Sequence, residues 1–162
     1  MSALEDRVRA AVATVEDPEV PITLQDLGVV RDVRVTGGEA RVVLRPTRLA
    51  CPARGEMARR VHEAVLSAAP DVRVEVDWEM AAWRGSDVSD RGTQVLLQIG
   101  YADPGAGAAT ACPYCGSSDV RSEGAFGGAV CKVPFSCRSC GSTYDALKGS
   151  AAAAAAAGGT RG

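Results

Sequence analysis

The sequence has a single histidine, His62, and no run of about 18 or more consecutive apolar residues. With one histidine, a histidine-based metal site and a Ser-His-Asp triad both have little support. Walker loops, GxGxxG turns and nucleophile elbows are also absent, which disfavours nucleotide chemistry. Because no segment is long and apolar enough to cross a bilayer, we expect no membrane partner.

An excess of basic residues is also missing. The chain has 18 lysines and arginines against 20 aspartates and glutamates, for a formal net charge of −2. Nucleic-acid binding needs clustered positive charge that neutralises phosphates, so we expect no nucleic-acid partner. The N-terminal residues MSALEDRVRA lack the basic start and apolar stretch of a signal peptide, which predicts a cytoplasmic protein.

The first hundred residues have the periodicities of a small α/β domain. A capping box formed by Ser2 and Glu5 predicts the start of an amphipathic helix, and Gly37-Gly38 predicts a hairpin turn. The order α-β-β-α-β predicts a two-layer α/β fold, with both helices on one face of a small mixed sheet. A short helix around 89–100 would complete it. The predicted elements are a helix over 4–15, strands over 29–35 and 40–44, a helix over 52–69 and a strand over 72–76.

Composition predicts four segments along the chain. Residues 1–100 form the α/β domain, and residues 101–110, rich in Gly, Ala and Pro, form a linker. Residues 111–148 form a second domain, and residues 149–162 form an alanine-rich, low-complexity tail. A domain as small as the second one seldom builds its own hydrophobic core and usually needs a metal or a disulfide to fold.

Four of the six cysteines form two CxxCG knuckles. Cys112 and Cys115 make the first knuckle, Cys137 and Cys140 make the second, and 21 residues separate the two pairs. Two residues between thiolates allow a tight turn to direct both sulfurs at one point. The glycine after each pair permits a positive φ that frees backbone N–H groups to bond sulfur. This spacing predicts a closed four-thiolate site, most simply a structural zinc site, in a zinc-ribbon β domain with strands over 120–125 and 130–137.

Cys131 also allows a second kind of metal site, an iron–sulfur site. It supplies a fifth thiolate near the knuckles, and thiolates also hold iron–sulfur clusters. The alternative is that Cys131 is a small buried apolar residue, because free cysteine is among the most buried residue types.

A second group of polar residues falls in the connections of the α/β domain. Cys51 is predicted at the N-cap of the second helix, where the helix dipole favours a thiolate and hence a reactive or metal-binding sulfur. Asp17, Glu19 and Asp26 would bring carboxylate oxygens to the same end, and Thr47 precedes Cys51 in its connection. The alternative is that the two aspartates are turn residues, Glu19 is solvated and Cys51 packs in the core.

Two stretches of sequence resemble a known family. The segment DPEVPITLQDLGVVRDVRV followed by PTRLACPA, with its DPE, DLG and T-x-x-x-CP signatures, resembles the SufT-like domain of iron–sulfur assembly proteins. The segment FGGAVCKVPFSCRSCGSTYDALK after CPYCG is similar to the zinc ribbon of the two-domain PaaD/PaaJ-like family. The resemblance covers about residues 5–148.

This resemblance implies an accessory, non-catalytic subunit of the phenylacetyl-CoA epoxidase, a ring-epoxidising di-iron oxygenase of aerobic phenylacetate catabolism. Such a subunit would assist the assembly of iron or an iron–sulfur cluster on the oxygenase or reductase subunits. Cys51 would be a transient iron or iron–sulfur ligand, with Asp17, Glu19 and Asp26 shaping its site. The chain lacks the ExxH pairs of a di-iron helical bundle, which agrees with a non-catalytic role. The competing hypotheses are a zinc-ribbon interaction or nucleic-acid-binding module with no role in metal delivery, and an enzyme with Cys51 as its nucleophile.

Overall fold

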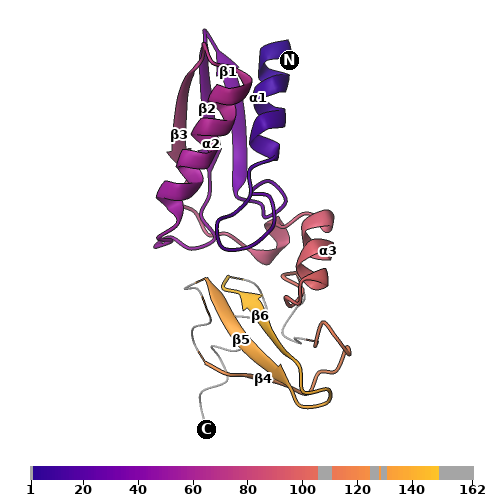
Figure 1. Cartoon of the computed structure of the whole chain (residues 1–162). Coiled ribbons are helices and arrows are strands. Elements are labelled where there is room, and N and C mark those ends of the chain that lie inside the picture. Colours follow the sequence, from indigo (N-terminus) through magenta and orange to yellow (C-terminus); the bar gives the residue numbers. More distant parts are fainter. Residues whose placement is uncertain (1, 106–110, 125–127, 129–130, 150–162) are drawn as a thin grey trace. The chain divides into compact units, whose positions relative to one another are not determined.

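The computed structural model describes residues 2–105, 111–124, 128 and 131–149. The chain divides into two compact units, Met1–Ala81 and Ala82–Gly162 (Figure 1). In the described part, no helix is long and apolar enough to cross a membrane. The first unit contains α1 (Ala3–Ala13), β1 (Val30–Thr36), β2 (Glu39–Leu44), α2 (Arg54–Ala68) and β3 (Arg73–Trp78). The second contains a 3-10 turn (Gly85–Asp87), α3 (Asp90–Gln98), β4 (Val120–Ser122), β5 (Lys132–Cys137) and β6 (Thr143–Leu147).

The first helix begins where the capping residue predicts. Ser2 is the N-cap, and its Oγ accepts the backbone N–H of Glu5 at 3.2 Å. The Glu5 carboxylate pairs with Arg9 one turn later, at 2.7 Å. Val8 and Val12 are buried, so the apolar stripe of α1 faces the core.

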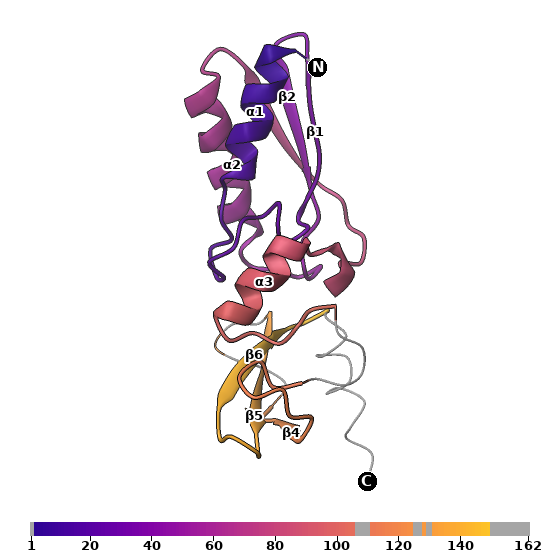
Figure 2. The same cartoon turned by 90° about the vertical axis from the view of Figure 1, so that its right-hand side faces the viewer.

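The first unit is the predicted two-layer α/β fold. Its sheet has the order β1-β2-β3, with β1 antiparallel to β2 and β3 parallel to β2. Gly37 and Gly38 form the hairpin turn with φ of 58° and 78°, a region that glycine enters without a steric penalty. Figure 2 shows α1 and α2 on the same face of this sheet. The opposite face carries ion pairs, such as the one between Arg41 and Asp77 at 2.6 Å.

The ribbon of the second unit is a three-stranded antiparallel sheet with the order β4-β5-β6. Two of its strands correspond to the predicted 120–125 and 130–137, although residues 125 and 130 lie outside the described part of the chain. The third, β6, has no counterpart in the sequence prediction. One face of the sheet is buried, and its core contains Ala102, Cys112, Val133, Phe135, Cys137, Tyr144 and Ala146.

Two residues at the start of the predicted linker are buried. Tyr101 and Ala102, which begin the predicted linker, are buried, and the N–H of Ala102 bonds the carbonyl oxygen of Asp145 in β6 at 2.9 Å. The helix α3 precedes them directly, and the N–H of Tyr101 bonds the carbonyl of Leu96 near its end at 2.8 Å. The helix α3 falls in the second unit, Ala82–Gly162, whereas the sequence predicts that it completes the first. Residues 106–110 of the predicted linker and 150–162 of the predicted tail lie outside the described residues.

Candidate functional site

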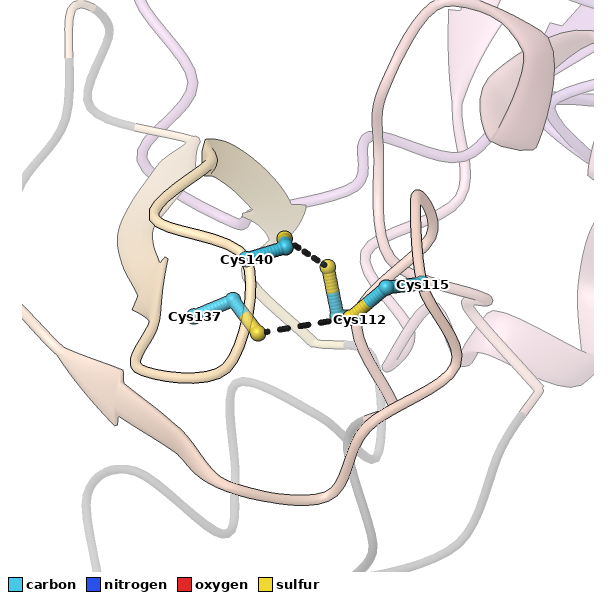
Figure 3. A group of neighbouring side chains, drawn as sticks. All are labelled: Cys112, Cys115, Cys137 and Cys140. Carbon is cyan, nitrogen blue, oxygen red and sulfur yellow. Dashed lines mark hydrogen bonds between the residues drawn. The ribbon is translucent and has the colours of Figure 1, made fainter.

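The four knuckle cysteines converge on one point. The sulfurs of Cys112, Cys115, Cys137 and Cys140 all lie within 4.8 Å of one another (Figure 3). The Sγ–Sγ distance is 3.7 Å between Cys112 and Cys140 and 3.6 Å between Cys115 and Cys137. Four sulfurs each about 2.3 Å from a zinc ion at the centre of a tetrahedron lie about 3.8 Å apart. The cluster therefore has the dimensions of a four-thiolate metal site.

Both knuckles use the same backbone turn. In the first, the N–H of Gly116 bonds the carbonyl of Cys112 at 2.8 Å, and in the second, the N–H of Gly141 bonds the carbonyl of Cys137 at 2.9 Å. The two glycines have φ of 73° and 75°, as the sequence predicts for these positions. Each turn closes with a serine whose carbonyl accepts the N–H of the first cysteine of its knuckle.

The same serines bond the second sulfur of each knuckle, with different outcomes for the two thiols. Hydrogen bonds from the Ser142 side chain and backbone lower the pKa of Cys140 to about 6. The Ser117 N–H also lowers the pKa of Cys115, but desolvation and the three neighbouring thiols outweigh it and raise that pKa to about 12. The two thiols therefore differ in pKa although their knuckles share one backbone geometry.

Cys131 is not part of this cluster. It is half-buried just before β5, and its carbonyl oxygen accepts the N–H of Lys148 at 2.7 Å. In the described part of the chain, the four knuckle cysteines are the one group of three or more His, Cys, Asp or Glu side chains with ligand atoms close together. The structure therefore does not place the fifth thiolate with the other four.

The connections that carry the second predicted site leave from one end of the first sheet. Val30 pairs with Leu44, and Leu44 pairs with Trp78, so β1 begins where β2 and β3 end. The N–H of Arg45 bonds the carbonyl of Val29 at 2.7 Å across this end. The connections over 14–29 and 45–53 therefore lie at the same end, as the prediction requires.

Within these connections, Asp17 and Asp26 both make local turn bonds. Asp17 Oδ1 accepts the backbone N–H groups of Glu19 at 2.8 Å and Val20 at 3.0 Å, and burial raises the pKa of its carboxyl group. Asp26 Oδ2 accepts the hydroxyl of Thr23 at 3.0 Å. Glu19, two residues after Asp17, is exposed. The Asp17 bonds are typical of an Asx turn, and the Asp26 bond closes a local loop with Thr23, so both aspartates fit the alternative of turn residues.

Cys51 lies outside the helix that was predicted to begin beside it. The helix α2 begins at Arg54, and its N-cap is Ala53, so the prediction of Cys51 as the N-cap is wrong. The chain makes a further turn first, in which the N–H of Arg54 faces the carbonyl of Cys51 at 3.5 Å. The dipole argument for an activated thiolate therefore loses its geometric basis. Cys51 remains half-buried, and it belongs to no group of three or more potential His, Cys, Asp or Glu ligands among the described residues. Thr47 is half-buried in a bend before it.

Two arginines of α2 border these connections, and sequence analysis did not single them out. The Arg60 Nη1 donates to the carbonyl of Glu16 at 3.3 Å, and its charge acts to lower the pKa of Asp17. The Arg54 guanidinium lies over the ring of Trp78 at 5.9 Å and contacts the sulfur of Met80 at 3.4 Å. No sequence signal marks them, because their role depends on which loop the helix packs beside.

Comparison with known proteins assigns the two parts of the chain to different families. Residues 5–78 match the family model of the iron-sulfur cluster assembly protein, and residues 101–148 match that of the PaaD zinc beta ribbon domain. The chain therefore resembles PaaD-like proteins in each of these two parts. A curated relative from Escherichia coli (strain K12), named as a putative 1,2-phenylacetyl-CoA epoxidase subunit, is 28% identical over 148 residues, which cover 86% of this chain and 89% of the relative.

A solved structure supports the fold of the first unit. The crystal structure of a domain of unknown function from Bacillus anthracis is 26% identical, with a TM-score of 0.54. The similarity covers 60% of the PaaD-like chain and 93% of the Bacillus domain. This likeness agrees with the α/β fold predicted from the sequence.

The donor set of the PaaD-like ribbon fits zinc. Four thiolates with no oxygen or nitrogen donor form a soft, tetrahedral environment, and two of the four, Cys112 and Cys137, are also part of the buried core. Zinc bound by Cys112, Cys115, Cys137 and Cys140 would hold the two knuckles together. Such a closed site leaves no open position for a substrate, which is typical of structural zinc.

Proposed function

We propose that this chain is an accessory, non-catalytic subunit of a phenylacetyl-CoA epoxidase that assists the assembly of iron or an iron–sulfur cluster on the oxygenase or reductase subunits. The observation that carries this proposal is the joining of an iron–sulfur assembly domain to a PaaD zinc ribbon in one chain. The relative named as an epoxidase subunit aligns along most of its own length, so the similarity spans both parts.

In this function, the first unit would bind iron or the cluster, and the second unit would stabilise the chain or bind the epoxidase subunits. Cys51 would bind the iron or cluster transiently as cargo, and Asp17, Glu19, Asp26 and Thr47 would shape its surroundings. A half-buried thiol in a connection is accessible enough for exchange. The ribbon, with zinc in its four-cysteine site, would stabilise the chain or bind the epoxidase subunits.

The test of this function is to delete the chain while all other epoxidase subunits are expressed. The oxygenase and reductase purified from that strain are expected to contain much less iron and to lose most of their activity. Reconstitution with iron and sulfide should restore activity in part, because the missing step is metal supply. Full iron content and full activity without the chain would remove the assembly role and favour a ribbon that acts only as an interaction module.

Cys51→Ala tests the transient ligand. In the deletion strain, this variant is expected to fold and bind zinc normally but to leave the oxygenase or reductase short of iron. The matched control is Cys131→Ala, which removes a second half-buried cysteine outside the four-cysteine cluster. The measurement is the iron content of the oxygenase and reductase purified from strains that carry either variant. If Cys51→Ala supports maturation as well as wild type, Cys51 is not the ligand.

Asp17→Asn tests whether the Asp17 carboxylate contributes to the Cys51 site or only holds the backbone turn. The amide oxygen of the new side chain can still accept the two backbone N–H groups, so the turn should persist. Because burial raises the folded-state pKa of Asp17, its contribution to stability is largest at acidic pH and falls as the pH rises through that pKa. At neutral pH, the variant should therefore unfold in urea at the same or a higher concentration than wild type, while maturation decreases. Unchanged maturation would show that Asp17 is a turn residue alone.

A further inference from the structure

One buried hydroxyl group in the ribbon has no hydrogen-bond partner. Tyr144 in β6 is 5% exposed, and its hydroxyl oxygen bonds nothing in the described part of the chain. Buried polar groups are nearly always paired, because an unpaired one gives up its bonds to water without replacement. The position of this hydroxyl group therefore needs an explanation.

The ring of Tyr144 lies on the face of the ribbon that also carries the metal ligands. Tyr144 pairs with Phe135 in β5, and the two rings stack with centroids 5.6 Å apart. Phe135 and Cys137 are two residues apart on one strand, so their side chains share a face. Tyr144 belongs to the same buried cluster as Cys112 and Cys137. The tyrosine therefore stands beside two of the four ligands.

The hydroxyl group of a neutral tyrosine can donate a hydrogen bond, and a metal-bound thiolate accepts hydrogen bonds from nearby donors. In the buried cluster that contains Tyr144, the other side chains with a polar atom are Cys112 and Cys137. Their sulfurs are therefore the candidate acceptors for this hydroxyl group.

We propose that Tyr144 is a positioning residue of the metal centre, whose hydroxyl group donates a hydrogen bond to a cysteine thiolate when the metal is bound. This bond would withdraw charge from one sulfur in a set that carries more negative charge than a dication neutralises. It would retain the metal and protect that sulfur from electrophiles. The inference rests on the four-cysteine metal site and is independent of iron delivery by the first unit.

Tyr144→Phe tests this inference, because it removes the hydroxyl group and keeps the stacked ring. Loss of a hydrogen bond to a metal ligand weakens metal binding by about ten- to a hundredfold. We therefore expect full-length Tyr144→Phe to release zinc to a competing chelator faster, and its cysteines to react faster with iodoacetamide. The cobalt-substituted variant should show a shifted sulfur-to-metal charge-transfer band. The matched control is Tyr114→Phe, which removes a hydroxyl group from a 59% exposed tyrosine within the first knuckle and should change none of these readouts.

The opposite result has a distinct signature. If the hydroxyl group stays unpaired in the metal-bound protein, Tyr144→Phe removes an unsatisfied polar atom and should raise the thermal stability of the ribbon, with zinc release and the cobalt spectrum unchanged. That result overturns the proposal. Cadmium-substituted wild-type protein gives an independent measurement by NMR: scalar coupling between cadmium and the Tyr144 hydroxyl proton is expected, and a proton in fast exchange with water contradicts the bond. Wild-type protein that binds no zinc, cobalt or cadmium would overturn the metal site itself.

Discussion

Cys137→Ser is expected to abolish metal binding and unfold the ribbon while the first unit, Met1–Ala81, stays folded. Cys137 is both a ligand of the cluster and a core residue, with 2% of its surface exposed. The described core of the ribbon is small, and domains of this size depend on their metal. In small zinc domains, the metal contributes an apparent free energy of about 10–16 kcal/mol near neutral pH, more than such a core can replace.

Metal analysis and residue-resolved NMR together measure this result. Wild type should contain one zinc per chain, and Cys137→Ser should contain none. Amide signals of residues 131–149 should collapse toward unfolded positions, while those of residues 3–78 remain dispersed. The matched control is Cys131→Ser, which makes the same chemical change at a cysteine outside the cluster and should keep both the zinc and the fold.

Two outcomes would contradict this account of the ribbon. A folded, zinc-containing Cys137→Ser protein would mean that three thiolates suffice and that the ribbon core is more stable than its size indicates. Loss of zinc from Cys131→Ser would mean that the fifth thiolate is a ligand after all. Cys115→Ser adds a further comparison, because Cys115 is an exposed ligand outside the core. Cys115→Ser should remove the metal as completely as Cys137→Ser does. Because Cys115 contributes no buried packing, this comparison distinguishes the loss of a ligand from the loss of a core side chain.

The sequence predicted the convergence of the four cysteines well because each knuckle is a local structure. Two residues between the cysteines and a glycine after them determine the turn, whatever the rest of the chain does. The observed φ of Gly116 and Gly141 and the serine N–H bonds to sulfur follow from that local pattern. The two knuckles must still meet across the sheet, and their spacing in the sequence was sufficient to predict this as well.

The surroundings of Cys51 were predicted less well because they depend on where a helix begins. Pro52 favours the first turn of a helix, yet the ordered helix starts two residues later, with Ala53 as an N-cap that makes no side-chain bond. A shift of two residues in the start of α2 leaves the fold unchanged. It does change the surroundings of Cys51, because it moves the thiol out of the helix terminus. Pro52 is compatible with the first turn of a helix and with the turn that precedes it, so the local sequence does not determine the first helical residue.

The strand β6 was missed although its sequence alternates. Tyr144 and Ala146 are buried, and Asp145 between them is half-buried, so the period of two is present. Five residues are too few for this pattern to stand out from a loop, and the strand is stabilised by pairing with β5, which no local signal reports. Ala102, whose N–H bonds Asp145, was assigned to the linker for the same reason.

The connection over 14–29 is expected to be anchored to the core mainly by Leu24, so Leu24→Ala should destabilise the first unit by about 2–5 kcal/mol. Leu24 is 0% exposed. Its N–H bonds the carbonyl of Val15 at 2.8 Å, and its own carbonyl accepts the N–H of Val29 at 2.8 Å. The side chain thus fixes the middle of the segment that carries Asp17, Glu19 and Asp26.

Leu49→Ala is the matched control, because it makes the same truncation in the neighbouring connection at a leucine that is 54% exposed. It should change the free energy of unfolding by no more than about 0.5 kcal/mol. Urea unfolding followed by NMR signals of the first unit measures both variants without assuming that the two units unfold together. Hydrogen exchange over residues 14–29 should accelerate in Leu24→Ala alone. Equal stability losses in the two variants would mean that the core does not position this connection, and the carboxylates it carries would then have no fixed place beside Cys51.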